Sequence, residues 1–343
     1  MRLKNVLYYR NLKPVLPNTI MVEPTNACNL KCRMCDYQGQ FKGARSYLSS
    51  KDFESIIFQF LKIKELIFCG LGEPLFNENI VEMVRIARKK NIPFINLITN
   101  GTLLEEEILK SLIKSGLNRI QVSFHSADPE IAKRINGMSL EDHNLVRANI
   151  LNAVKIRDAL GSDLCIVINS VINIENSEDL FNLIDFCEDN KIDEINFVQL
   201  TTVFGKYEGF NIGKNKARQL MKKIRVRLKK SRLTYGFLSG NCVGRCYQLW
   251  NFIMICADGT ISPCNGIMPH EKIGLGNLIH EDISQIWHSD KYVMLRKSVI
   301  EKHLKNCEYC EAGYPLEGKN FEWVNNYYLK PLIRNLYSYI RNE

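Results

Sequence analysis

The stretch "TIMVEPTNACNLKCRMC", residues 19–35, joins a short apolar run to a loop that contains Cys28, Cys32 and Cys35. The run "TIMVEP" has the apolar and β-branched residues that are typical of a buried strand. No fourth cysteine lies close by in the sequence. A strand followed directly by three thiols predicts a site at the end of that strand.

The first 200 residues repeat this strand in alternation with helices. Helical spacing is clear in "NENIVEMVRIARKKN", residues 77–91, where apolar residues recur at i, i+3, i+4 and i+7. The further predicted strands are residues 64–70, 93–99, 118–124, 164–172 and 194–200. Strands that are apolar on both faces and alternate with helices predict a parallel sheet. Because six units are too few for a closed barrel of eight, the predicted fold is an α/β partial (β/α)6 barrel with a small C-terminal cysteine-rich domain.

The loops that follow the predicted strands carry the polar and glycine-rich segments. "GLGEP", residues 70–74, follows the second strand, "TNG", residues 99–101, the third, and "SFHS", residues 123–126, the fourth. Active sites of parallel α/β barrels lie at the carboxyl ends of the strands. These loops and the cysteine loop are therefore expected to meet at one mouth.

Three thiols on one loop fit an iron–sulfur cluster better than zinc. Structural zinc sites favour two close pairs of ligands, whereas a [4Fe–4S] cluster held by three thiolates keeps one iron open. The spacing Cys28-x3-Cys32-x2-Cys35 after the first strand resembles the motif of the radical S-adenosylmethionine (SAM) superfamily, and the resemblance covers roughly residues 20–205. It implies that the open iron binds SAM, whose reductive cleavage yields a 5′-deoxyadenosyl radical that abstracts hydrogen from a substrate.

The same resemblance assigns residues to the SAM site. "GLGEP" resembles the family's GGEP loop, in which Glu73 would meet the cofactor ammonium, and Ser123 stands where the family places a serine near the ribose or carboxylate. Met34 replaces the usual aromatic residue, so its backbone is the candidate contact to adenine. Asn136 replaces an arginine that the family often has before a glycine, which leaves Arg134 or Arg147 to reach the carboxylate. The assigned residues are Met34, Gly70, Gly72, Glu73, Thr99, Asn100, Ser123 and Arg134.

A second set of cysteines lies in the tail, in "NCVGRCYQLWNFIMICADGTISPCN", residues 241–265, and "NCEYC", residues 306–310. The spacing of Cys246, Cys264, Cys307 and Cys310 resembles the SPASM domain or its shortened form, the twitch domain. This implies one auxiliary [4Fe–4S] cluster, which four cysteines close completely. A zinc ribbon and the exchange of Cys242 for Cys246 are the alternatives. The remaining thiols are predicted to be core residues: Cys69, Cys165, Cys187 and Cys256.

The chain is expected to divide into five segments. They are an N-terminal extension (1–18), the radical SAM partial barrel (19–205), a basic linker helix (206–240), a SPASM/twitch-like iron–sulfur domain (241–317) and a C-terminal helical tail (318–343). Residues 214–232 hold ten Lys or Arg and no acid, within a net charge of +9. This stretch is either the solvated face of a helix or a surface for an anionic partner.

The sequence also predicts the cellular location of the protein and the kinds of partner that it has. No apolar stretch approaches the ~18 residues of a membrane helix, and no signal peptide is recognised, so a cytoplasmic protein is expected. No nucleic-acid motif is present, and no nucleic-acid partner is expected. The electron for SAM cleavage implies a flavodoxin- or ferredoxin-type reductant.

The reaction is predicted from the auxiliary cluster. A cluster without an open iron can accept an electron from the substrate radical, which favours a two-electron oxidation of a small polar alcohol of the sugar or cyclitol type. Only 27 residues precede Cys28, whereas peptide-modifying relatives often carry an N-terminal recognition domain. Peptide or protein modification is the first alternative, and a non-enzymatic iron–sulfur carrier or scaffold is the second. No residue is assigned to catalysis itself.

Overall fold

One curved sheet organises the protein. The computed structural model describes residues 11–35, 45–200, 208–238, 248–264 and 274–301. Within them the sheet has nine strands in the order β7-β6-β5-β4-β3-β2-β1-β8-β9, and every neighbouring pair is parallel except β8 with β9. The strands are β1 (Thr19–Val22), β2 (Glu65–Phe68), β3 (Phe94–Thr99), β4 (Arg119–Ser123), β5 (Cys165–Ile172), β6 (Glu194–Gln199), β7 (Thr234–Leu238), β8 (Phe252–Ile255) and β9 (Ile261–Ser262).

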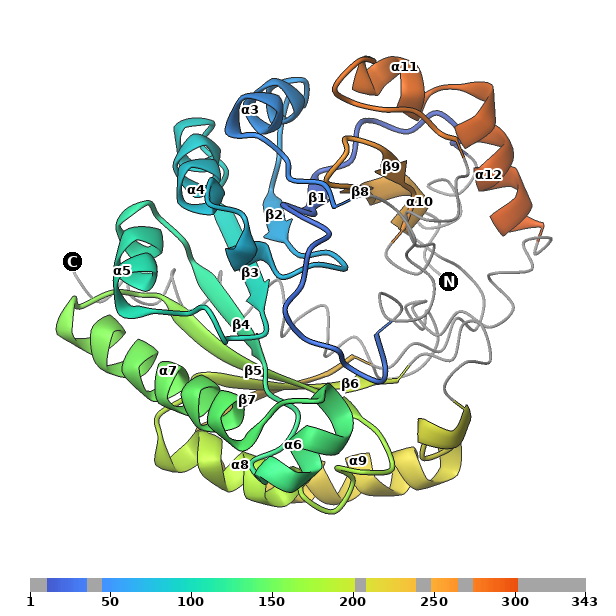
Figure 1. The fold of residues 1–343 in the computed structure, drawn as a ribbon. Coiled ribbons are helices and arrows are strands. Elements are labelled where there is room, and N and C mark those ends of the chain that lie inside the picture. Colours follow the sequence, from blue (N-terminus) through green and yellow to red (C-terminus); the bar gives the residue numbers. More distant parts are fainter. Residues whose placement is uncertain (1–10, 36–44, 201–207, 239–247, 265–273, 302–343) are drawn as a thin grey trace, which may run out of the picture.

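Helices cover the outer, convex face of this sheet (Figure 1). Local signals fix several of their ends: the Ser49 side chain accepts from the Asp52 N–H, Ser139 and Asp142 form a capping box, and Gly137 ends a helix at φ 68°. The helices are α3 (Ser50–Phe58), α4 (Ile80–Lys89), α5 (Glu106–Lys114), α6 (Pro129–Asn136), α7 (Leu140–Ala159), α8 (Leu180–Asp189), α9 (Lys214–Leu228), α10 (Gln248–Asn251), α11 (Ile283–Trp287) and α12 (Asp290–Ile300). Two short 3₁₀ turns are η1 (Pro74–Phe76) and η2 (Glu208–Phe210).

The two faces of the strands differ in chemistry. Outward residues such as Ile20, Val22 and Phe68 are fully buried and belong to the main core under the helices. The inner face carries polar side chains on β3 to β6, such as Asn196 on β6, which donates from Nδ2 to Asn169 Oδ1 on β5 at 3.1 Å. On β1 and β8 it carries an apolar cluster of Met21, Phe252 and Met254. At the amino-terminal end of the strands Arg119 and Glu194 form a buried ion pair at 2.5 Å.

The six predicted strands are confirmed, and three further strands, β7, β8 and β9, extend the sheet at its ends. The segment 206–240, predicted to be a linker helix, contains α9 but also β7, which pairs in parallel with β6. Phe237 of β7 stacks on Phe197 of β6, with ring centroids 5.5 Å apart, so apolar packing holds this strand on the sheet. From the tail, β8 pairs in parallel with β1, with Met254 opposite Met21.

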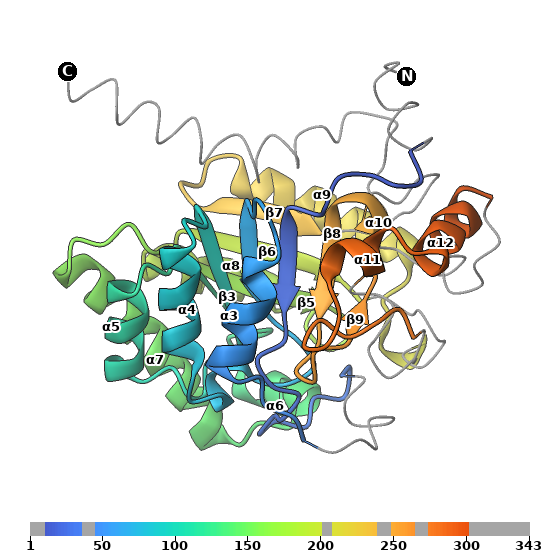
Figure 2. The same ribbon diagram turned by 90° about the horizontal axis from the view of Figure 1, so that it is seen from above.

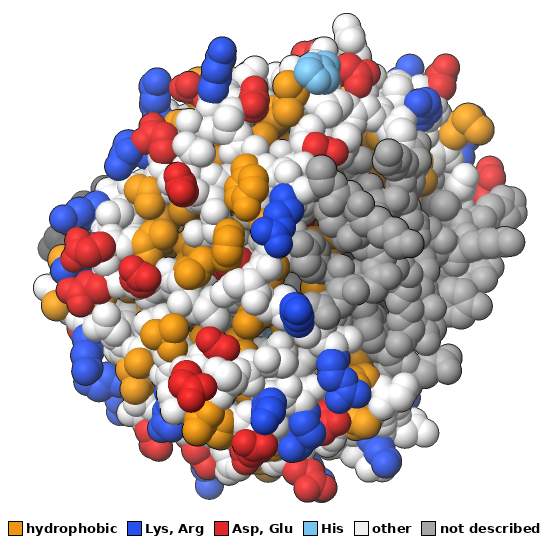
Figure 3. All heavy atoms as spheres, viewed as in Figure 1, with side chains coloured by type: hydrophobic (Ala, Val, Ile, Leu, Met, Phe, Trp, Pro, Cys, Tyr) orange, Lys and Arg blue, Asp and Glu red, His pale blue; other side chains and the backbone are white. Residues whose placement is uncertain are grey.

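Among the described residues no helix has the length and apolar character needed to cross a membrane. On the face shown in Figure 3, acidic and basic side chains are interspersed. On the basic helix α9, Arg227 pairs with Asp185 at 2.7 Å and Glu188 at 2.5 Å, so part of the positive charge is neutralised within the fold.

Candidate active site

The three cysteines lie where the sequence predicts, on the loop that leaves β1. In Figure 2 the arrow of β1 points towards this loop and towards α6, so the loop lies at the carboxyl ends of the strands. Cys28, Cys32 and Cys35 are all partly exposed, and the Cys35 N–H donates to the Cys32 carbonyl at 3.0 Å. Burial, followed by the neighbouring thiols of Cys35 and Cys28, raises the pKa of Cys32 to about 12. The three side chains are therefore close enough to interact.

The donor set fits a polynuclear iron cluster rather than one metal ion. No group of three His, Cys, Asp or Glu side chains converges on a single ion position anywhere in the described ranges. In a [4Fe–4S] cluster each thiolate binds a different iron, so the ligands surround the cluster and need not converge on one point. Soft thiolates are also the preferred ligands of iron–sulfur clusters.

The glycines of "GLGEP" allow this loop to pack against the cysteine loop. A Cβ on Gly72 would lie 2.2 Å from the Thr25 carbonyl oxygen and 2.6 Å from that of Ala27. The Glu73 N–H donates to the same Ala27 carbonyl at 2.8 Å. Glycine is required here by a neighbouring backbone, in addition to any approach of the cofactor.

Glu73 connects the second loop to the third. Its buried carboxylate accepts from Thr99 Oγ1 at 2.6 Å, the Asn100 N–H at 2.6 Å and the Leu75 N–H at 3.1 Å. Burial raises the pKa of this carboxyl, and the three hydrogen bonds oppose the rise. The predicted contact with the cofactor ammonium stays a prediction, and it would add to these three bonds.

Asn100 connects the third loop to a cysteine. Its Nδ2 donates to Cys28 Sγ at 3.9 Å and to Asn29 Oδ1 at 2.9 Å, while its Oδ1 accepts from the Thr102 N–H at 2.9 Å. The Asn29 Nδ2 in turn donates to Thr102 Oγ1 at 2.8 Å. The loops after β1, β2 and β3 therefore form one hydrogen-bonded unit around the first cysteine.

Helix α6 supports the other end of the cysteine loop. The Arg33 N–H donates to the Ile135 carbonyl at 3.0 Å, and the Arg33 guanidinium lies 4.5 Å from the centre of the Phe210 ring. The Met34 side chain packs in the apolar cluster that contains Ile135, Leu200 and Phe210. Its side chain therefore serves packing, which leaves the backbone as the predicted adenine contact.

The two arginines considered for the carboxylate are engaged elsewhere. Arg134 is 49% exposed at its side chain and pairs through Nε with Glu175 at 2.6 Å. Arg147 is exposed on α7, with its guanidinium over the Phe186 ring at 5.5 Å. Ser123 is partly exposed at the end of β4, and its role at the ribose or carboxylate stays a prediction.

The sequence prediction missed Glu23, the residue that follows β1. Its side chain is 2% exposed; Oε1 accepts from the Leu71 N–H at 2.7 Å and Oε2 from the Ala257 N–H at 3.2 Å. Leu71 belongs to "GLGEP", and Ala257 follows β8 on the way to Cys264. One carboxyl group therefore connects the SAM-site loop with the hairpin of the tail.

Of the four predicted ligands of the auxiliary cluster in the tail, Cys264 lies within the described residues. Cys264 is partly exposed after β9, where its carbonyl accepts from Ser262 Oγ at 2.9 Å. Cys246, Cys307, Cys310 and the alternative ligand Cys242 lie outside the described residues. Of the thiols predicted to be core residues, Cys187 and Cys256 are buried, whereas Cys69 and Cys165 are only partly buried on the inner face of the sheet.

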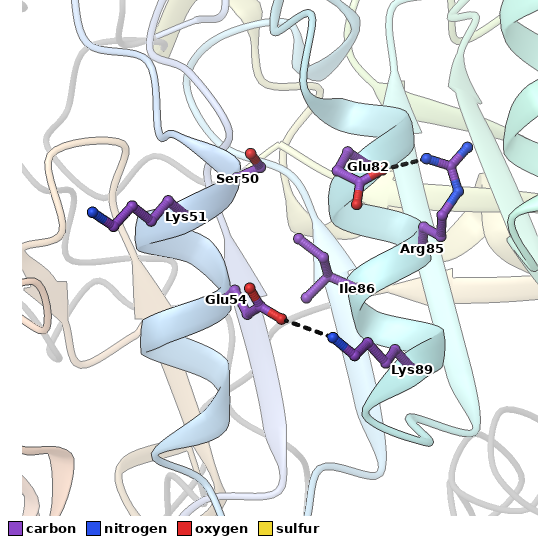
Figure 4. A pocket seen from close by; sticks show the side chains of 7 residues that line it. All are labelled: Ser50, Lys51, Glu54, Glu82, Arg85, Ile86 and Lys89. Atoms are coloured by element: carbon purple, nitrogen blue, oxygen red, sulfur yellow. Dashed lines mark hydrogen bonds and ion pairs between the residues drawn. The ribbon is translucent and has the colours of Figure 1, made fainter.

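A separate pocket of about 330 Å³ lies on the outer surface between α3 and α4 (Figure 4). Four of its five charged side chains pair with one another, Glu54 with Lys89 at 3.4 Å and Glu82 with Arg85. The pocket is lined by Ser50, Lys51, Glu54, Glu82, Arg85, Ile86 and Lys89. Because most of the charges that line this pocket pair with one another at the surface, the loops after the strands are the better candidate for the functional site.

Family models match both parts of the chain. The model of the Radical SAM superfamily matches residues 22–187, and that of the SPASM iron–sulfur cluster-binding domain matches residues 246–311. The chain belongs to the radical SAM superfamily. The predicted cofactors are confirmed at this level, because the two domains imply a [4Fe–4S] cluster that binds SAM and an auxiliary iron–sulfur cluster.

Known proteins resemble this radical SAM protein over different lengths. A probable GTP 3′,8-cyclase of Sulfolobus acidocaldarius is 29% identical over 182 residues, which cover 52% of this chain and 55% of that protein. A PqqA peptide cyclase of Gluconobacter oxydans is 22% identical over 294 residues, covering 80% and 77%. The crystal structure of Streptococcus suis SuiB bound to precursor peptide SuiA has a TM-score of 0.67 and 19% identity, covering 91% of this chain and 75% of that one. This last likeness shows a shared fold.

Proposed function

We propose that this chain is a radical SAM enzyme that modifies a peptide. The observation that carries the proposal is the length of the match to the PqqA peptide cyclase, which runs over 80% of this chain. The match to the GTP 3′,8-cyclase covers 52% of this chain. The match to the PqqA peptide cyclase therefore extends over more of the chain than the barrel, and this favours a peptide as the substrate.

The fold supports the same choice. SuiB, whose structure holds a precursor peptide, matches 91% of this chain in fold. The prediction of a small polar alcohol as substrate is thus supported less well than its alternative, peptide modification. A non-enzymatic carrier is also disfavoured, because a carrier does not need a set of loops built to hold a second cofactor beside the cluster.

The residues around the cysteine loop would preorganise the reaction. When bound by Cys28, Cys32 and Cys35, a [4Fe–4S] cluster supplies the electron for reductive cleavage of SAM to a 5′-deoxyadenosyl radical. Asn100 orients the first thiol, and the Glu73 carboxylate fixes the second loop against the third. Supporting contacts of this kind hold reactive groups within a fraction of an ångström of the productive geometry.

A substrate panel tests the proposal. Reconstituted, dithionite-reduced protein is incubated with SAM and with short peptides encoded beside its gene, scrambled versions of the same peptides, or sugars and cyclitols. We expect 5′-deoxyadenosine formation to rise with one native peptide, together with a change in the mass of that peptide. A decrease of two mass units in a sugar or cyclitol, with the mass of every peptide unchanged, would overturn the peptide assignment.

A further inference from the structure

Glu23 stands between the SAM-site loop, residues 70–74, and the tail hairpin, residues 252–262. Its backbone N–H donates to the Ile255 carbonyl at 2.8 Å, and the Cys69 N–H donates to the Val22 carbonyl at 2.9 Å. The pairing of β1 with its neighbours β8 and β2 therefore continues to the point where both neighbours end. The Glu23 side chain leaves the backbone at this junction, where the SAM-site loop and the turn of the hairpin begin.

Each carboxyl oxygen of Glu23 accepts a hydrogen bond from a different segment. Oε1 accepts from the Leu71 N–H at 2.7 Å, and Oε2 accepts from the Ala257 N–H at 3.2 Å. Solvent hardly reaches the carboxyl group, since the residue is 2% exposed. Because a buried backbone N–H that loses its acceptor destabilises the fold, the loop and the hairpin both depend on this one side chain.

The SAM-site loop is shaped to receive the Glu23 side chain. A Cβ on Gly70 would lie 2.3 Å from Glu23 Cγ and 2.5 Å from Oε1, so glycine is required for the contact. Glu73, two residues after Leu71, accepts from Thr99 Oγ1 at 2.6 Å on the loop after β3. Glu23 therefore fixes the beginning of the SAM-site loop, while Thr99 fixes its end.

The contact with Ala257 lies in the turn of the tail hairpin. The Cys256 N–H donates to the Thr260 carbonyl at 2.9 Å, which closes the turn, and β9 follows directly. At the end of β9, Ser262 donates from Oγ to the Cys264 carbonyl at 2.9 Å. A short path of hydrogen bonds therefore runs from Glu23 to Cys264, the predicted ligand of the auxiliary cluster.

We propose that Glu23 is a positioning residue that couples the SAM-site loop to the tail hairpin, so that SAM bound at the loop also restrains the hairpin. The carboxylate satisfies both N–H groups only when both segments lie against it. A ligand that orders one segment therefore reduces the entropy that is lost when the other is ordered, and the coupling is reciprocal. The inference rests on the part of the proposed function in which this loop binds SAM, and it does not depend on the substrate.

Hydrogen exchange at single amides tests this coupling, because both donors to Glu23 are backbone N–H groups. Reconstituted full-length protein is exchanged under anaerobic conditions with and without SAM, and the Leu71 and Ala257 amides are resolved by mass spectrometry. We expect SAM to slow exchange at both amides in the wild type, by about fivefold at Ala257. Glu23→Gln offers one acceptor oxygen to two N–H groups, so SAM should have no effect at Ala257 in this variant.

Two further variants separate coupling from a general loosening of the hairpin. Asn277→Ala removes the bond from Nδ2 to the Asp258 carbonyl at 2.8 Å, which holds the hairpin from its other side. Exchange at Ala257 should become faster in this variant and should still slow when SAM binds. Glu23→Asp keeps the charge but is one methylene shorter, so it should lose the effect of SAM at Ala257 as Glu23→Gln does. Iron content and the thermal midpoint show whether each variant is folded.

The possible outcomes bear on different parts of the proposal. Slower exchange at Leu71 with no change at Ala257 in the wild type would overturn the coupling and leave SAM binding intact. An effect of SAM at Ala257 that persists in folded Glu23→Gln or Glu23→Asp protein would overturn the role of Glu23. A fully reconstituted wild type that does not bind SAM in equilibrium dialysis would overturn the proposed function itself.

Discussion

Replacement of Glu23 by Gln perturbs the carboxyl group that connects the SAM-site loop to the tail. Burial raises the pKa of Glu23 from 4.5 to about 7, against the opposing effect of its backbone hydrogen bonds to Leu71 and Ala257. The folded protein thus holds the proton more tightly than the unfolded chain does. The stability that this proton contributes is complete below pH 4.5 and is lost as the pH rises through 7.

The size of the effect follows from these two pKa values. At about 1.4 kcal/mol for each tenfold change, the full loss is about 3 kcal/mol, of which about 2 kcal/mol falls between pH 5.5 and 8. Gln does not titrate, so the difference in unfolding free energy between wild type and Glu23→Gln should shift by about 2 kcal/mol, against wild type, over that range. The Glu23 side chain is only 2% exposed, so solvent screens little of this effect.

Urea unfolding of reconstituted protein, followed by circular dichroism at several pH values, measures this difference. Effects of pH on other groups are common to both proteins and cancel in the comparison. A constant difference between wild type and Glu23→Gln from pH 5.5 to 8 would instead mean that Glu23 has the same pKa in the folded and unfolded states.

Three further changes test other parts of the site. Gly72→Ala puts a Cβ 2.2 Å from the Thr25 carbonyl oxygen. We therefore expect urea unfolding to show a loss of about 2 kcal/mol of stability, and reconstitution to give less bound iron. A variant with the stability and iron content of wild type would show that the loops do not need this contact. Glu73→Gln should weaken SAM binding by roughly 1.5–3 kcal/mol in equilibrium dialysis at normal iron content, and unchanged affinity would remove Glu73 from the site. The Cys307→Ala, Cys310→Ala double variant should bind about four irons instead of about eight and still release 5′-deoxyadenosine, yet form no product, and normal turnover by a folded variant would make the tail cluster structural.

The sequence predicts the barrel well because its signals are local. Apolar runs of four to eight residues alternate with segments of helical periodicity such as residues 77–91. The cysteine spacing also predicts the position of the site, since any loop that follows a parallel strand reaches the same edge of the sheet. These features depend on neighbours within one or two turns of the chain.

Features that depend on distant partners could not be predicted in the same way. Glu23 reads as the end of a strand before Pro24, and its partners Leu71 and Ala257 are 48 and 234 residues away. The pairing of β8 with β1 is similarly remote, because "FIMI" reads equally well as part of a separate tail domain. The ring of His125 likewise accepts a hydrogen bond from the Val171 N–H, which lies 46 residues later in the chain.

The central claim is that the thiols of Cys28, Cys32 and Cys35 hold the cluster at which SAM is cleaved. The most direct measurement is the amount of 5′-deoxyadenosine that reconstituted, dithionite-reduced protein releases from SAM, quantified by liquid chromatography with mass spectrometry. We predict release by the wild type, and none by a variant in which all three cysteines are Ala and which retains about four irons in the tail. Release of equal amounts by that variant, or no release by a wild type with about eight irons, would contradict the claim.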